Sequence, residues 1–397
     1  MKKLSDLAAA VTGSTTLAIS AMAKQLREEG QDVIGFGAGE PDFNTPAPIA
    51  EAAVKAIYDG QTRYTPAAGI VPLRKAVCAR LQADCGITYD HSQIVITSGA
   101  KHAVYLALQV LLNPGDEVIL PAPYWVSYYE MIKLAGGVPV IVEGTEAADF
   151  KITAAQLEGA VTGRTKLLVL NNPSNPTGML YAKDELEALC RVCTARDLYI
   201  LSDEIYYRLV YGGKPFVSVP SLGGEIKART ILINGVSKSY AMTGWRIGYA
   251  AANHEIAAMI SNYASHATGA PATIAQYAAV EALTGAQTPV EEMRDVFEKR
   301  RDDIVRRVNQ IDGLSCITPD GAFYVMLNIQ ALAGKTLGGR MIQTGDDFAM
   351  ALLEQAGVAV VPCGSFGAPG FVRLTYAAST EAIQEGLNRI ESFVRGV

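Results

Sequence analysis

Ile94-Val95-Ile96-Thr97-Ser98-Gly99-Ala100-Lys101 is a β-branched run that leads into a turn of small residues. A helical pattern follows over residues 101–112, so this stretch predicts a strand, a turn and a helix. The same alternation continues through the middle of the chain. Strands are predicted at residues 94–97, 117–120, 138–142, 166–170, 199–202 and 230–234. Helical patterns between them, such as 125–135 and 183–195, indicate βαβ units and therefore an α/β fold with a mostly parallel central sheet.

The pattern changes after the last of these strands. Thr288-Pro289-Val290-Glu291 has the spacing of a helix capping box, and a long helix is predicted to follow as far as Ile311. Beyond it, short strands and helices predict a smaller α+β domain, which we expect an N-terminal helix over 16–29 to join. The expected division is a large domain over 46–285 and a small domain made of 1–45 and 286–397.

The composition is that of a folded globular chain. Of its 397 residues, 49% are hydrophobic and 19% are charged, and 34 basic against 40 acidic residues give a net charge of −6. This balance argues against nucleic acid or an anionic membrane surface as the main partner. No apolar run approaches the ~18 residues of a membrane span. Lys2-Lys3 loosely resembles the start of a signal peptide, but Asp6 and the polar residues 12–16 interrupt the pattern, and we expect a cytoplasmic protein.

The cysteines and histidines indicate neither a disulfide framework nor a metal site. Six cysteines are few for a disulfide scaffold in a chain of this length. Cys190 and Cys193 have C-x-x-C spacing, but they lie in a helical pattern that favours small core residues over a redox or metal motif. The four histidines show no metal-ligand spacing, and we expect no metal.

Two turns of the α/β region are candidates for ligand binding. The turn at Gly99 precedes a predicted helix, and free N–H groups at a helix start favour an anion such as phosphate. Many turns of this kind bind nothing. Asn171-Asn172-Pro173-Ser174-Asn175-Pro176-Thr177-Gly178 is either an ordinary Pro/Gly turn or a stiff turn that aims the Asn175 amide at a ligand.

Three charged residues follow strands or stand among apolar neighbours. Asp203 ends the strand 199–202, where an acid faces the ligand crevice of a parallel sheet, or else caps a helix. Lys238 follows the strand 230–234, where it points into the same crevice or is a solvated surface lysine. Arg246 stands between small and aromatic residues, and an arginine in such surroundings normally needs an anionic partner.

In combination, these elements resemble the aspartate aminotransferase family, class I enzymes of fold-type I that depend on pyridoxal 5′-phosphate (PLP). The resemblance runs from Gly39-Glu40-Pro41-Asp42-Phe43 to Val372-Arg373-Leu374-Thr375-Tyr376. Its most diagnostic segments are Asn175-Pro176-Thr177-Gly178, Ser202-Asp203-Glu204-Ile205-Tyr206, Ser237-Lys238 and Gly244-Trp245-Arg246-Ile247-Gly248-Tyr249. It implies a large PLP-binding domain with a mostly parallel sheet and a smaller α+β domain.

The resemblance also implies roles for single residues. Lys238 is expected to form the Schiff base with PLP and to move the proton at the substrate Cα. Asp203 is expected to pair with the ring nitrogen and keep it protonated, which makes the ring an electron sink. Asn175 and Tyr206 are expected to hydrogen-bond the 3′ oxygen of the ring. Trp125 resembles the aromatic that stacks on the ring and borders the substrate, although a core tryptophan is the alternative.

The phosphate of PLP has its own expected set of contacts. By resemblance, it is bound by backbone N–H groups at the turn and by two side chains. These residues are Gly99, Ala100, Lys101, Ser237 and Arg246. Tyr64 resembles a tyrosine that reaches this phosphate from the neighbouring subunit, which implies a homodimer with shared active sites. Gly235 departs from the family, because several relatives have a serine there, and this departure puts the full set of phosphate contacts in doubt.

The substrate is expected to be an amino acid or a 2-oxo acid. Arg373 resembles the arginine that binds the α-carboxylate, in a pocket completed by Gly39 and Asn175. Lys101 stands where a lysine binds an acidic substrate side chain in one bacterial branch, and a solvated lysine is the alternative. We therefore expect a ping-pong transaminase that converts L-aspartate and 2-oxoglutarate to oxaloacetate and L-glutamate.

Three alternatives remain open from the sequence. An aromatic or prephenate aminotransferase shares every cofactor residue, so only a substrate panel separates it. A PLP-dependent C–S lyase or synthase needs no oxo-acid acceptor. A ligand sensor in a transcription regulator needs a basic DNA-binding segment, and both the acidic charge and the short segment ahead of Gly35 argue against it.

Overall fold

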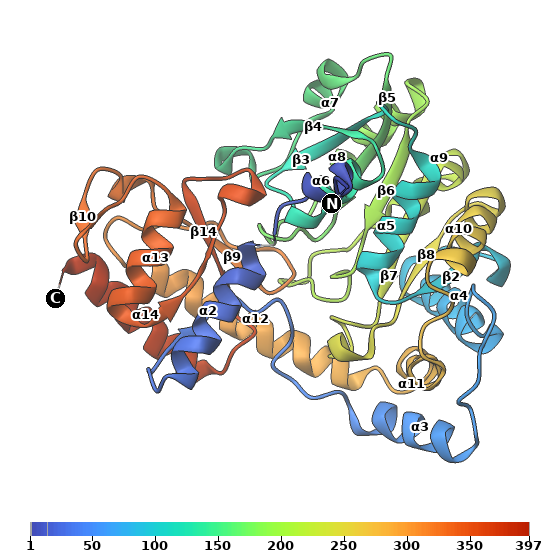
Figure 1. Ribbon diagram of the computed structural model, residues 1–397, viewed down its shortest axis with the longest axis horizontal. Helices are drawn as coiled ribbons and strands as arrows, with labels where there is room; N and C mark the ends of the chain where they lie inside the picture. Colours follow the sequence, from blue (N-terminus) through green and yellow to red (C-terminus); the bar gives the residue numbers. More distant parts are fainter. Residues whose placement is uncertain (1, 14, 397) are drawn as a thin grey trace.

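The structure is a computed structural model that describes residues 2–13 and 15–396 (Figure 1). A seven-stranded sheet has the order β2-β8-β7-β6-β5-β3-β4. Its strands are β2 (Ile94–Thr97), β3 (Glu117–Ala122), β4 (Val138–Glu143), β5 (Thr165–Asn171), β6 (Tyr199–Asp203), β7 (Thr230–Gly235) and β8 (Gly248–Ala251). Only the two pairs that involve β8 are antiparallel, which confirms the predicted α/β fold with a mostly parallel sheet. The sequence does not predict β8, because Gly248-Tyr249-Ala250-Ala251 contains no β-branched residue.

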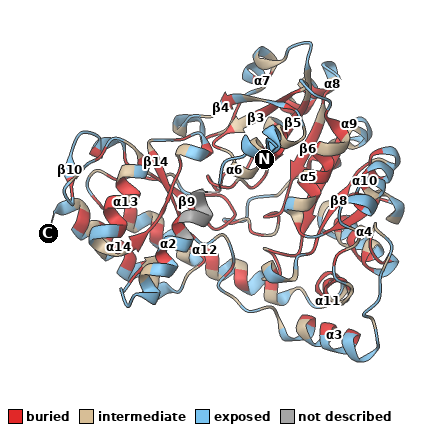
Figure 2. Ribbon diagram, viewed as in Figure 1, coloured by how far each residue is buried: buried red, intermediate tan, exposed pale blue. Residues whose placement is uncertain are grey.

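Helices cover both faces of this sheet. On one face lie α5 (Ala100–Leu111), α6 (Val126–Leu134) and α10 (His254–Ala267), and on the other α7 (Ala154–Ala160) and α8 (Lys183–Ala195). Because side chains alternate along a strand, Leu167 of β5 packs with the first group and Leu168 with the second. All strands except the edge strand β4 are consequently buried on both sides (Figure 2). The remaining helices of this region are α3 (Ala47–Tyr58), α4 (Val71–Cys85), α9 (Gly224–Arg229) and α11 (Thr273–Thr284).

A second, smaller body contains a three-stranded antiparallel sheet of order β13-β14-β9. Its strands are β9 (Tyr324–Asn328), β13 (Val361–Pro362) and β14 (Phe371–Thr375), and its helices are α12 (Thr288–Val308), α13 (Gly345–Ala356) and α14 (Thr380–Arg395). The N-terminal helix α2 (Thr15–Glu28) packs here, and β1 (Ile34–Gly35) pairs with β12 (Val358–Ala359) (Figure 1). The segment from α2 to β1 therefore lies with the C-terminal part of the chain, whereas Ala10 and Thr12 bond to Lys133 and Glu130 of α6 in the larger body. The exact domain boundaries at 45/46 and 285/286 stay a prediction.

Two local predictions have clear outcomes. The capping box at Thr288 is wrong, because Thr288 is already helical and Gln287 is the N-cap. The carbonyl oxygen of Gln287 accepts the N–H groups of Val290 and Glu291, while its side chain is held by carbonyls of the preceding turn. The prediction for Cys190 and Cys193 is confirmed, since both are fully buried on α8 in the apolar core. Within the described residues, no helix is long and apolar enough to cross a membrane.

Candidate active site

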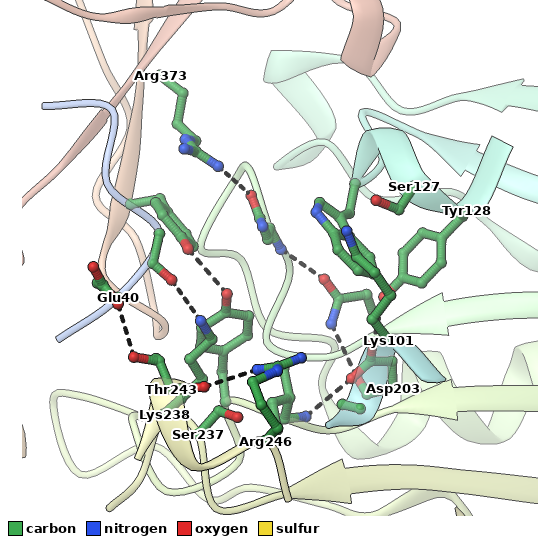
Figure 3. A pocket seen from close by; sticks show the side chains of 18 residues that line it. Glu40, Lys101, Ser127, Tyr128, Asp203, Ser237, Lys238, Thr243, Arg246 and Arg373 are labelled. Carbon is green, nitrogen blue, oxygen red and sulfur yellow. Dashed lines mark hydrogen bonds between the residues drawn. The ribbon is translucent and has the colours of Figure 1, made fainter. Parts of the chain in front are cut away.

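A cavity of about 400 Å³ opens at the carboxyl ends of the parallel strands, between the two bodies (Figure 3). Its lining confirms that most of the residues singled out from the sequence lie together. These are Gly39, Ala100, Lys101, Trp125, Asn175, Asp203, Tyr206, Ser237, Lys238, Arg246 and Arg373. The loops after β5 and β7 bring in Asn175 and Lys238. Asp203 is the last residue of β6, and β14 brings in Arg373 from the smaller body.

Lys238 reaches into this cavity, and is therefore not a solvated surface lysine. Its Nζ atom donates a hydrogen bond to the carbonyl oxygen of Gly39. Burial lowers the pKa of Lys238 from 10.5 to about 8, because the ammonium loses hydration. The carboxylate of Glu40 opposes this shift in pKa, whereas the positive charges of Arg246 and Arg373 add to it. Near neutral pH, a larger fraction of an amine with this pKa is uncharged, and hence nucleophilic, than of an ordinary lysine.

Asp203 ends β6 and is almost fully buried at the floor of the cavity. One carboxylate oxygen accepts a hydrogen bond from the hydroxyl of Tyr128 at 2.7 Å, and the other accepts the N–H of Ile205 at 3.2 Å. Burial raises the pKa of Asp203 from 3.8 to about 6, and these two hydrogen bonds oppose that rise. Turns rather than a helix follow Asp203, so the helix-cap alternative is wrong.

The turn before α5 has the features of an anion cradle. Gly99 is the N-cap with φ +83°, and its N–H bonds to Thr97. The N–H groups of Ala100 and Lys101 have no partner within the described chain and point out of the helix start. The guanidinium of Arg246 lies against this turn and donates to the carbonyl of Thr243 at 2.8 Å. A Cβ atom at residue 99 would lie 2.4 Å from Nη2 of Arg246, so glycine is required for the close approach.

Arg373 is held rigidly on the opposite side of the cavity. Nη1 donates to Oδ1 of Asn175 at 3.0 Å, and Nη2 donates to the carbonyl of Gly37 at 3.1 Å. The guanidinium carbon lies 4.3 Å from the ring centroid of Tyr324. Nε is buried and has no hydrogen-bond partner among the described residues. This arrangement fixes a cation in the wall of the cavity, which suits a carboxylate.

Trp125 and Lys101 form a third part of the wall. Trp125 is only partly buried and contributes to the cavity lining, so it is not simply a core tryptophan. Its ring packs edge-on against Tyr128 at 5.2 Å, and Nζ of Lys101 lies 4.9 Å from its centroid. Partial burial, and then the charge of Arg246, lower the pKa of Lys101 below its usual value of 10.5.

The charges that line the cavity are predominantly positive. Four basic side chains face two carboxyl groups: Lys101, Lys238, Arg246 and Arg373 against Glu40 and Asp203. The site therefore favours a ligand with several negative charges, such as a phosphate ester together with a carboxylate. A family model described as aminotransferase class I and II matches residues 31–390. The chain belongs to the class I and II aminotransferases.

This aminotransferase is 51% identical to an aspartate aminotransferase of Geobacillus stearothermophilus, over 99% of both chains. It is 45% identical to an aspartate/prephenate aminotransferase of Cereibacter sphaeroides, over 100% of both chains. Among solved structures, the aspartate aminotransferase of Rhizobium meliloti matches with a TM-score of 0.96 and 40% identity, over 100% of this chain and 99% of that one. The aspartate aminotransferase of Thermus thermophilus with maleate matches with a TM-score of 0.93 and 40% identity, over 100% of both.

Membership of this family implies PLP as cofactor, and the residues of this aminotransferase fit that group. The cradle at Gly99 and Arg246 suits its phosphate, because it combines free N–H groups with a guanidinium. Asp203 offers a buried carboxyl to a basic ring nitrogen. Lys238 offers an amine of lowered pKa to an aldehyde.

Sequence reasoning about this aminotransferase missed seven lining residues: Glu40, Ser127, Tyr128, Asn171, Ile205, Thr243 and Tyr324. Asn171 accepts the N–H of Asn175 at 2.7 Å and donates to the carbonyl of Asp203 at 2.9 Å, so it joins the turn after β5 to the end of β6. Its place at the end of a predicted strand was an available signal. Tyr128 and Tyr324 gave none, because each occupies a position that a helix or strand pattern assigns to the core.

Three residues that the sequence singled out in this aminotransferase do not line the cavity: Gly99, Tyr64 and Gly235. Tyr64 is fully exposed and contributes nothing to the lining within a single chain. Gly235 also lies outside the lining, and it pairs with Gly248 on β8. A Cβ atom at residue 235 would lie 2.8 Å from the Cα atom of Gly248. The departure from serine is therefore explained by close backbone packing at this point.

Proposed function

We propose that the chain binds PLP and transfers the amino group of L-aspartate to 2-oxoglutarate by a ping-pong mechanism, which gives oxaloacetate and L-glutamate. The observation that carries the proposal is one cavity that contains Lys238, Asp203, Arg246 and Arg373. These side chains supply an amine, a buried carboxyl, a phosphate partner and a carboxylate partner. The names of the most similar relatives point in the same direction.

The phosphate is held in this proposal by the backbone N–H groups at the start of α5, by Ser237 and by Arg246. Trp125 packs on the ring, and Asn175 and Tyr206 contact the 3′ oxygen. The hydroxyl of Tyr206 lies 3.0 Å from that of Tyr324, so its position is fixed by a second buried tyrosine. When bound, PLP supplies an aldehyde that amines can attack and a ring that accepts electrons.

Lys238 moves the proton during the reaction. Its amine would hold PLP, and the bound cofactor would supply the aldehyde for that link. Once a substrate amine had replaced it there, the amine of Lys238, with its lowered pKa, would be the base that moves the proton at the substrate Cα. Asp203 keeps a positive charge on the ring nitrogen, because the buried carboxylate stabilises a proton there.

The substrate is held at both ends. Arg373 binds the α-carboxylate through its planar fork, with Gly39 and Asn175 beside it. Lys101 lies on the opposite wall, next to Trp125, and binds the distal carboxylate of aspartate or glutamate. An aromatic or prephenate substrate is the second candidate, because a relative of 45% identity has the name aspartate/prephenate aminotransferase.

The assembly and location are also part of the proposal. We infer a homodimer in which Tyr64 of the partner subunit reaches the phosphate, supported by the full exposure of Tyr64 in a single chain. Sedimentation should give twice the chain mass.

We infer a cytoplasmic location, supported by six cysteines that are all unpaired. Fractionation of cells should recover the activity with the cytoplasm.

A panel of amino donors tests the substrate. Purified enzyme with PLP is assayed with 2-oxoglutarate against aspartate, alanine, phenylalanine and glutamine, and then with prephenate as acceptor. Aspartate should give the highest kcat/KM. Lys101→Ala should lower kcat/KM for aspartate by roughly tenfold to a hundredfold, as expected for a lost charge-assisted contact, and leave alanine nearly unchanged.

Lys183→Ala is the matched control, because Lys183 also stands in the first turn of a helix but is exposed and does not line the cavity. Its kcat/KM should equal that of the wild type. If Lys101→Ala keeps the preference for aspartate over alanine, the acidic pocket is wrong. If phenylalanine or prephenate is preferred, the second candidate replaces the first.

A further inference from the structure

His102 stands directly behind the anion cradle without lining the cavity. It is the third residue of α5 and is half-buried. Nδ1 accepts a hydrogen bond from the backbone N–H of Ser98 at 3.2 Å. Nε2 lies 3.3 Å from the hydroxyl of Thr268, which can in turn donate to the carbonyl of Gly269 at 3.4 Å.

These contacts fix the protonation state of the imidazole. Nδ1 can accept from Ser98 only when it has no proton. The proton of the neutral ring is then on Nε2, which donates to Thr268, and the hydroxyl of Thr268 donates onward to Gly269. Each donor meets an acceptor in this arrangement. A second proton, on Nδ1, would face the N–H of Ser98 and break the contact.

The contact from His102 decides which N–H groups of the turn remain free. The N–H of Ser98 is used by His102, and that of Gly99 by the carbonyl of Thr97 at 2.8 Å. The N–H groups of Ala100 and Lys101 remain for a ligand. Ser98 is also held from its other side, because Nη2 of Arg246 lies 3.5 Å from its carbonyl oxygen. The geometry of the cradle therefore depends on how Ser98 is held.

We propose that neutral His102 is a positioning residue of the cradle, and that a second proton on its ring releases Ser98 and weakens phosphate binding. The proposal rests on the proposed function, in which this cradle holds the phosphate of PLP. Its consequence is that the enzyme retains PLP less well in acid, through a residue that touches neither the cofactor nor the substrate.

The surroundings of His102 determine the pH at which its ring takes up the second proton. Burial lowers the pKa of His102 below its usual value of 6.5, because the charged ring is less hydrated there. The titratable neighbours are Lys101 and Tyr105 on α5, and Tyr263 and His266 on α10, with Arg246 beyond Ser98. None of these described groups contributes to the shift in the pKa of His102. Burial therefore favours the neutral ring, and the contact is lost at a more acid pH than that at which an ordinary histidine takes up its proton.

The test measures binding rather than activity. Apoenzyme is prepared from the PLP-loaded dimer, and the Kd for PLP is measured from cofactor absorbance between about pH 5 and pH 8. His102→Asn can accept from Ser98 but does not titrate, and His102→Leu cannot accept at any pH. His91→Asn is the control, because His91 lies beyond the opposite end of β2.

The quantity to compare is the ratio of the wild-type Kd for PLP to the Kd of His102→Asn. We expect this ratio to rise about tenfold as the pH falls, because the loss of one hydrogen bond changes a Kd by about that factor. The ionisation of PLP itself cancels in this ratio. His102→Leu should bind PLP about tenfold more weakly at pH 7. The inhibition constant of inorganic phosphate against PLP binding should change in the same way, since phosphate probes the cradle alone.

The alternative outcomes are separable. If the wild type and His102→Asn give the same pH profile, the proposal is overturned. It is also overturned if the PLP ratio changes while the phosphate ratio does not, because the effect then lies outside the cradle. If wild-type apoenzyme binds no PLP at any pH, the proposed function fails instead.

Discussion

The Nζ atom of Lys238, which follows β7, donates a hydrogen bond to the carbonyl oxygen of Gly39, which follows β1. This contact joins the two bodies of the molecule inside the cavity. Burial is the main cause of the lowered pKa of this amine. Below a pH of about 8 the amine is mostly charged, and above it mostly neutral.

The reactivity of Lys238 should therefore rise through a pH of about 8, rather than through the ordinary value of 10.5. The measurement is acylation of apoenzyme by a small reagent over a range of pH, with the modified lysines quantified by mass spectrometry. Exposed Lys183 serves as the internal reference for the reagent. A midpoint for Lys238 near 10.5 would contradict the burial of this amine.

Glu40→Gln extends this prediction. The carboxylate of Glu40 opposes the lowering of the Lys238 pKa, so its neutral replacement should move the midpoint further below 8. The hydrogen bond from Thr243 to Glu40 at 2.7 Å can be kept by the amide, which limits any other change. An upward movement of the midpoint would show that the two groups are not coupled as their charges require.

Tyr128→Phe should raise the pKa of Asp203 above its present value of about 6. The variant removes a buried donor from the carboxylate, and such a bond to a charged group contributes about 1.5–3 kcal/mol, or roughly one to two pKa units. The carboxylate form, present above the pKa, then needs a higher pH. Activity should fall most near pH 6 and recover as the pH rises, which a pH profile of kcat measures.

Tyr129→Phe is the control for this prediction. Tyr129 is the next residue on α6 and stacks on Tyr124, and no hydrogen bond links it to Asp203. Its pH profile should match that of the wild type. Equal profiles for both variants would mean that the hydroxyl of Tyr128 does not tune the carboxyl.

Much of the fold follows from local sequence patterns. Six strands of the central sheet have β-branched runs, and their alternation with helices is enough to predict a parallel sheet. β8 has no β-branched residue and therefore lacks that signal. It forms because it pairs with both β2 and β7, which are far apart from each other in the sequence. The start of α12 was misjudged because Thr288 has the residue type of a cap, while the structure uses Gln287.

The residues of the candidate site also fall into those that the sequence indicates and those that it does not. Lys238, Asp203 and Arg246 were identifiable because each stands at a strand end or in a distinctive motif. Tyr324 and Tyr128 act through contacts made across the fold, with Tyr206 and Asp203. Their spacing in the sequence is that of ordinary core residues, so no local pattern indicates the hydroxyl partner.

Gly99→Ala should weaken PLP binding by more than tenfold. Residue 99 has φ +83° and ψ 163°, a region that is essentially restricted to glycine and costs another residue about 1–3 kcal/mol. The Cβ atom of an alanine would also lie 2.4 Å from the guanidinium of Arg246. Gly60→Ala is the matched control, because Gly60 has φ +74° but no atom near the position of a Cβ. Both variants should lose thermal stability, and only Gly99→Ala should raise the Kd for PLP. Equal values of Kd for the two variants would exclude a role for this close approach.

Arg373→Lys should raise KM for the amino donor by roughly tenfold to a hundredfold while the protein stays folded. Lysine keeps the charge but cannot reproduce the fork that reaches Asn175, Gly37 and the carboxylate at once. Because that interaction binds the substrate before the chemical step, kcat should change less than KM.

Tyr324→Phe is the control for this prediction. The variant keeps the ring whose centroid lies 4.3 Å from the guanidinium of Arg373, and it removes only the hydroxyl that is bonded to Tyr206. KM should stay near the wild-type value in that variant. A large rise in KM for Tyr324→Phe, with none for Arg373→Lys, would place the carboxylate site elsewhere in the cavity.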